Sequence, residues 1–130
     1  MIVRSDSEAL ARWAGSRFGC TFVPPYVAWG ITDRKGMVTA VAVFREYEFA
    51  NIEVVAVGTG WTRQFLREAG QYCFGQLKRE RVSITARMSD RLVHDLAVRL
   101  GARLEGIKRN YYAKGEDAAM YGVLKDEYRF

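Results

Sequence analysis

The stretch from Ile52 to Leu66, IEVVAVGTGWTRQFL, joins an expected strand to an expected helix through a short glycine turn. The first amides of a helix have no partner within it and point outward, where the helix dipole adds partial positive charge. Gly58 and Gly60 allow the backbone to approach a ligand closely, and Arg63 adds a cation suited to phosphate oxygens. The pattern predicts a pyrophosphate site, although an ordinary strand-to-helix turn can carry the same glycines.

Other residues that commonly do chemistry are scarce in this chain of 130 residues. Cys20, Cys73 and His94 are too few for a structural zinc site, so no metal is expected. Cys73 falls on the apolar face of an expected helix, which predicts burial in the core. No apolar run is long enough to span a bilayer, and the N-terminus lacks the apolar segment of a signal peptide, so we expect a cytoplasmic protein with one domain over residues 1–130.

The net charge of +5 comes entirely from the second half of the chain. Residues 1–60 hold six Lys/Arg and six Asp/Glu, whereas residues 61–130 hold fourteen Lys/Arg and nine Asp/Glu. Such a half would favour a polyanionic partner, either a phosphorylated cofactor or nucleic acid. A solvated basic surface is the alternative.

Hydrophobic periodicity predicts alternating strands and helices. Val38, Ala40, Ala42 and Phe44 alternate with further apolar residues, so their strand is expected to be covered on both faces. The expected inner stripe of the last helix is Leu92, Val93, Leu96 and Leu100. Strands are expected at residues 1–4, 26–33, 37–47, 51–57, 81–87, 103–113 and 118–125, and helices at 5–15, 62–77 and 90–100. The order β-α-β-β-β-α-β-α-β-β predicts an α/β (α+β) fold with a mixed sheet and helices on both faces.

This order and several motifs resemble the GNAT superfamily of acyl-CoA-dependent N-acyltransferases, especially its small phage and prophage members, over residues 26–126. The family signature, [QR]-x-x-G-x-[GA] after a strand, falls on Val57-Gly58-Thr59-Gly60-Trp61-Thr62, where Gly60 matches and Val57 and Thr62 depart from the pattern. The helix from Asp90 to Leu100-Gly101-Ala102, the following Glu105-Gly106 and the tail NYYAKGEDAAMYGVLKDE are similar to the family's later segments. Asp90 replaces the usual Asn, and Ala102 the usual Phe.

The resemblance implies transfer of an acetyl group from acetyl-CoA to an amine, in a sheet whose two central strands splay apart. An alkyl ammonium has a pKa of about 10, so a base must remove its proton before attack. Glu53 is the expected base, at a position where some family members carry one, and Asn51 on the same strand face would orient a water or the substrate. The alternative for Glu53 is an exposed strand carboxylate or a buried ion pair.

The cofactor-binding residues implied by the resemblance surround the glycine turn. A backbone amide near Ala56 or Val57 would polarise the thioester carbonyl. The signature stretch, Thr59 included, would hold the pyrophosphate through the amides of Gly60, Trp61, Thr62 and Arg63, with the Thr62 hydroxyl as a further donor. Asp90 is expected to cap its helix and Arg91 to approach the nucleotide, unless Arg91 is simply solvated. Trp61 would pack under the turn or lie beside the cofactor.

The general acid is not identified by the resemblance, because the frequent helix tyrosine of the family maps to Ala97. Tyr112 in the last strands is the named candidate, and Tyr111, Tyr121 and His94 are alternatives that are more commonly packing residues. Solvent can also protonate a thiolate.

Two function classes follow. The first is an N-acetyltransferase acting on an unidentified small amine, protein amine or nucleic-acid amine, including a modified base of phage DNA. The second is a catalytically reduced binding module of the same fold for nucleic acid or a protein partner. Edge strands near the C-terminus would allow a homodimer.

Overall fold

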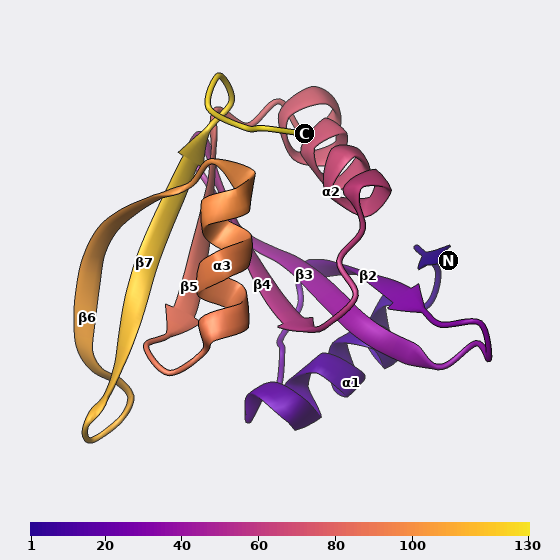
Figure 1. Ribbon diagram of the computed structural model, residues 1–130, viewed down its shortest axis with the longest axis horizontal. Coiled ribbons are helices and arrows are strands. Elements are labelled where there is room, and N and C mark those ends of the chain that lie inside the picture. Colours follow the sequence, from indigo (N-terminus) through magenta and orange to yellow (C-terminus); the bar gives the residue numbers. More distant parts are fainter.

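The computed structural model describes residues 1–130, and its elements follow the predicted order (Figure 1). They are β1 (Ile2–Val3), α1 (Ser7–Phe18), β2 (Tyr26–Thr32), β3 (Val38–Glu48), β4 (Asn51–Gly58), α2 (Arg63–Gly70), a π-helix (Gln71–Gln76), β5 (Arg81–Arg87), α3 (Arg91–Leu100), β6 (Arg103–Ala113) and β7 (Glu116–Leu124). The predicted fold class, a mixed sheet with helices on both faces, is confirmed. None of the helices is both long and apolar enough to cross a lipid bilayer.

The seven strands form one sheet in the order β1-β2-β3-β4-β5-β7-β6, in which only β4 and β5 are parallel. Their pairing begins at Asn51 opposite Arg81 and ends at Val54 opposite Ile84. Both strands continue beyond that point, β4 to Gly58 and β5 to Arg87, without pairing to each other. Figure 1 shows them diverging from their paired end, with α3 in front of the space between them. The sheet is therefore split in its centre.

Two apolar cores lie on opposite faces of the sheet. Along β3, Val41 and Val43 pack with α1, whereas Ala42 and Phe44 pack with α2 and α3. This alternation confirms that β3 is covered on both faces. Cys73 is 2% exposed in the larger core, as its position on the helix predicts.

The first helix begins later than predicted. Its N-cap is Asp6, whose carboxylate accepts from the Ala9 amide at 3.2 Å, so the helix does not begin at residue 5 as predicted. Glu8, in the first turn, pairs with Arg12 one turn on. The helix also runs past the predicted end at Gly15 to Phe18, and Gly19 ends it in the left-handed region.

The helix predicted over residues 62–77 is present, but it changes type at Gln71. The regular α-helix ends at Gly70 and a π-helical segment follows. A Cβ on Gly70 would lie 2.3 Å from the Tyr128 ring, so this glycine allows the C-terminal segment to pack closely on the helix. Widened turns of this kind are frequent beside functional sites.

The inner face of α3 is shifted relative to the prediction. Leu92 is 60% exposed, whereas Ala97 is fully buried beside Val93, Leu96 and Leu100. Packing on the sheet beneath α3 selects this face, which the apolar pattern alone did not distinguish from its neighbour.

Candidate functional site

The turn between β4 and α2 presents a row of backbone donors. The amides of Gly60, Trp61, Thr62 and Arg63 donate to no acceptor in the protein. Thr62 is the N-cap of α2, and its hydroxyl accepts from the Phe65 amide at 3.1 Å. The row lies at the positive end of the helix dipole, so the turn has the donors and the potential of an anion site.

Packing against β3 and within the turn sets its shape. Gly58 has φ 103°, and a Cβ there would lie 2.1 Å from the Thr39 carbonyl oxygen. The Thr59 amide donates to that same oxygen at 3.0 Å, which leaves the hydroxyl as the one Thr59 donor that can reach a ligand. The Trp61 indole donates to the Gly58 carbonyl at 3.2 Å and contacts Phe65 edge to face. Trp61 therefore packs within the turn.

The split between β4 and β5 opens beyond Val54 and extends along β4 to this turn. The Thr59–Thr39 hydrogen bond continues the β3–β4 register, in which Val57 pairs with Val41. Because hydrogen-bonding direction alternates along an antiparallel strand, the Val57 amide points to β3 and the Ala56 amide points into the split. Of the two amides predicted near the thioester, geometry favours Ala56.

A cavity of about 270 Å³ connects the turn with α3. Gly58, Thr59, Gly60 and Trp61 form one wall, and Asp95 and Arg99 are on the other. Arg99 is not among the residues predicted from the sequence. Its spacing of seven and three residues from Leu92 and Leu96 was the available signal, because residues so spaced share one helix face.

Glu53 lies on the opposite face of the sheet, the α1 face, where it is 7% exposed. The Arg45 Nε atom lies 3.4 Å from Glu53 Oε2 across the β3–β4 pair, but it is buried without a hydrogen-bond partner. Thr85 of β5 and Glu46, which bulges from β3 with φ 53°, also interact with the Glu53 carboxyl. The carboxyl is thus enclosed by groups from the two neighbouring strands, β3 and β5.

The pKa of Glu53 is raised to about 7, mainly by burial and then by a hydrogen bond shared with the Glu46 carboxyl. Arg45 acts in the opposite direction and only partly offsets these effects. A base is most effective when its pKa lies near the working pH, so this carboxyl can both accept and release a proton at neutrality.

Tyr112 approaches the same region from β6, which shifts its register between Lys108 and Ala113 and packs against the end of α1. Its ring lies 4.1 Å from the Arg87 guanidinium carbon and 5.8 Å from the Phe18 ring. The hydroxyl is buried and has no hydrogen-bond partner. Burial raises the pKa of Tyr112 to about 12, against the effect of Arg87, so the group is protonated and free to donate.

Arg87 holds this arrangement together, although the sequence patterns did not single it out. Its Nη2 donates to the Phe18 carbonyl at 2.7 Å, and its Nη1 lies 3.6 Å from Glu116 Oε2. The available signal was the alternation along β5, because Ser83, Thr85 and Arg87 point to the face opposite its apolar side chains.

The remaining candidates lie apart from these groups or have other partners. Asn51 is at the closed end of the β4–β5 pair, where its amide oxygen accepts from Arg81 and Ser83. Asp90 is the N-cap of α3 and accepts from the Val93 amide at 3.2 Å, and Arg91 is exposed. His94 Nε2 lies 3.0 Å from the Arg87 carbonyl oxygen, and because a carbonyl oxygen only accepts, Nε2 is the donor. In the neutral ring, Nδ1 then accepts from the Tyr121 hydroxyl at 2.6 Å, so the pair links α3 to β7.

No protein-family model and no curated protein matches the sequence. Solved structures do match the fold. A single-residue mutant of spermidine N-acetyltransferase from Vibrio cholerae superposes with a TM-score of 0.76 at 11% identity, over 98% of this chain and 95% of that chain. Ribosomal-protein-S5-alanine acetyltransferase from Vibrio fischeri gives 0.66 at 14% identity, over 81% and 64% of the two chains. A protein described as a putative acetyltransferase gives 0.66 at 25% identity, over 81% and 60%.

Proposed function

The chain has the fold of the GNAT superfamily acyltransferases, and from this premise we propose that it transfers an acetyl group from acetyl-CoA to an amine. The observation that carries the proposal is the row of unpartnered amides from Gly60 to Arg63, which follows the unpaired end of β4. An anion site next to an opening in a sheet suits a ligand with a diphosphate at one end and an extended arm.

The fit of acetyl-CoA rests on these donors and on charge. The four amides and the Arg63 side chain would hold the diphosphate, and Arg99 across the cavity adds a second cation near it. The pantetheine arm would lie in the split. There the Ala56 amide, which has no partner on β5, would donate to the arm or to the thioester oxygen.

The two faces of the split would have different tasks. The diphosphate end binds on the α2 and α3 face, and the acceptor amine approaches from the α1 face, where Glu53 lies. Glu53 would take the proton of the ammonium group, directly or through a water, as the carbon–nitrogen bond forms. Tyr112 would donate its proton to the departing thiolate, and the carbon–sulfur bond breaks.

Thermal unfolding with and without acetyl-CoA tests the binding step. Saturating acetyl-CoA, at about 100 times its Kd, adds roughly 2.7 kcal/mol to stability and raises Tm by several degrees. S-Acetylcysteamine, which has the thioester but no diphosphate, serves as the control and leaves Tm unchanged. An unchanged Tm with millimolar acetyl-CoA removes the proposal.

A second candidate is a binding module that has kept the fold without turnover. The observation that favours it is Ala97, which is fully buried and leaves no hydroxyl at the position of the family's frequent helix tyrosine. Release of free CoA thiol with a panel of primary amines distinguishes the two. Tight binding of acetyl-CoA without thiol release from any amine supports the module.

A further inference from the structure

A second cavity lies deeper than the one at the turn, between α2, α3 and the sheet. Its volume is about 50 Å³, and sixteen of its seventeen lining residues are hydrophobic. Trp61 and Leu96 line both cavities, so the deep one adjoins the cavity at the turn at these two side chains.

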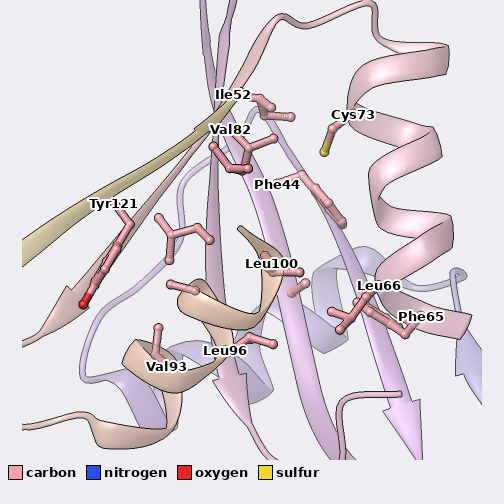
Figure 2. Packing of buried hydrophobic residues seen from close by; sticks show 14 of the residues in the cluster. Phe44, Ile52, Phe65, Leu66, Cys73, Val82, Val93, Leu96, Leu100 and Tyr121 are labelled. Carbon is pink, nitrogen blue, oxygen red and sulfur yellow. The ribbon is translucent and has the colours of Figure 1, made fainter. Parts of the chain in front are cut away.

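The deep cavity extends past the end of the split. A ligand arm lying between β4 and β5 must stop at Val54 and Ile84, because the strands pair from there on. The cavity continues over the paired part of the sheet, where Phe44 and Val82 form its floor and Cys73 its roof. Figure 2 shows the Cys73 sulfur pointing from the helix toward these sheet residues.

The apolar lining of the deep cavity disfavours bound water. A water-sized group needs about 10–15 Å³ of such space, so the cavity has room for roughly three to five groups of that size. Burial raises the pKa of the Cys73 thiol to about 12, so the group stays neutral. Water in the cavity would find few polar partners, whereas a hydrocarbon chain would need none.

We propose that this cavity receives the acyl chain of the thioester and that the preferred donor is an acyl-CoA with about four to six acyl carbons, longer than acetyl. The proposal rests on the acyl-CoA site proposed above. In that site the carbonyl lies near Ala56, and groups beyond it can leave the split only into this cavity or toward the α1 face.

Isothermal titration of the full chain in the absence of an amine tests the preference. The ligands are acetyl-, butanoyl-, hexanoyl- and decanoyl-CoA, with free CoA as the reference. We expect affinity to rise about fourfold per added methylene up to hexanoyl-CoA, since each buried methylene contributes by that factor, and to rise no further at decanoyl-CoA. Equal or weaker binding of butanoyl- and hexanoyl-CoA relative to acetyl-CoA overturns the inference.

These outcomes are separate from failure of the proposed function. If neither acetyl-CoA nor any longer thioester binds, the proposed acyl-CoA site itself is wrong. If all of them bind with one affinity, that site stands and only the deep acyl pocket is wrong.

Substitutions at Cys73 test the location of the chain. Cys73→Met fills the cavity and should weaken hexanoyl-CoA binding about tenfold, with acetyl-CoA within about twofold of wild type. Cys73→Ala enlarges the cavity and should move the preference toward longer chains, which keeps the test valid if the larger side chain prevents folding.

Val98→Met is the matched control, because Val98 is 57% exposed on α3 and lines neither cavity. It should leave the whole series unchanged. Unaltered hexanoyl-CoA binding in both Cys73 variants would show that the longer chain binds elsewhere on the protein, and would overturn the inference.

Discussion

Arg45 Nε lies 3.4 Å from Glu53 Oε2 across the paired strands β3 and β4, yet the pKa of Glu53 is raised to about 7. The Arg45 Nε atom makes no hydrogen bond, and burial together with the neighbouring Glu46 carboxyl outweighs its attraction. A well-aligned ion pair would have held Glu53 ionised and too weakly basic for proton transfer at neutrality. The poor alignment of Arg45 with Glu53 therefore allows the Glu53 carboxyl to exchange protons near neutral pH. This affects both the rate of acyl transfer and the free energy of unfolding.

For the rate, we expect kcat/KM for an amine acceptor to rise with pH and to level off above about 7, as Glu53 loses its proton. Glu53→Gln should lower kcat/KM by about 10²- to 10⁴-fold and move the rise toward the acceptor's own pKa of about 10. Thiol release across a pH range of roughly 5.5–10.5, which covers the expected rise in both proteins, measures both effects. Glu48→Gln, at an exposed carboxylate of the same hairpin, is the control, and a wild-type profile in Glu53→Gln would refute the base assignment.

For stability, the sign follows from the raised pKa. Between its ordinary value of 4.5 and about 7, the folded state binds more protons at Glu53 than the unfolded state does, so stability falls as pH rises through that window. The contribution is fully present below pH 4.5 and is lost above 7, a change of about 1–3 kcal/mol.

Urea unfolding at about pH 5 and about pH 8, on either side of most of this window, measures the change. Glu53→Gln should be more stable than wild type at the higher pH and lack this part of the pH dependence. The expectation fails if wild type and Glu53→Gln lose the same stability between the two pH values.

Substitution of Tyr112 is expected to affect the rate of acyl transfer and the free energy of unfolding differently. Because its buried hydroxyl has no partner, Tyr112→Phe should leave the free energy of unfolding unchanged or raise it by up to about 1 kcal/mol. The ring and its contacts with Arg87 and Phe18 remain. Acyl transfer should nevertheless fall by about tenfold or more if the hydroxyl protonates the thiolate.

Tyr111→Phe removes an exposed hydroxyl next to it in the chain and should change neither quantity. Chemical denaturation and thiol-release assays on the three proteins decide the matter. Full activity in Tyr112→Phe would remove Tyr112 as the acid and leave that task to solvent.

Gly58 is expected to be required for the turn itself. Gly58→Ala places a Cβ 2.1 Å from the Thr39 carbonyl oxygen in a residue with φ 103°, and we expect a loss of about 3 kcal/mol or more. Gly36→Ala is the matched control, since Gly36 has φ 80° and a Cβ there would meet no atom within 4 Å, and it should cost about 1 kcal/mol. Denaturant unfolding compares them, and equal losses would show that strain in φ, and not contact with β3, keeps Gly58 in place.

Much of the architecture could be predicted from the sequence because its signals are local. Alternation marked β5 at residues 81–87 and the two buried faces of β3, and Asp90 with Gly101 marked the ends of α3. The glycine turn after β4 and the unpaired amides of a helix start are likewise properties of a few neighbouring residues. Such features depend little on what the rest of the chain does.

What the tertiary structure decided involves residues far apart in the chain. Tyr128, near the C-terminus, packs against Gly70 at the point where the α-helix changes to a π-helix. The order of strands brings Thr85 and Tyr112 to Glu53, and the burial of its carboxyl in this enclosed site is the main cause of its raised pKa. Sequence patterns record which side chains share a face of one element, but the electrostatic environment of a carboxyl depends on every element that covers it.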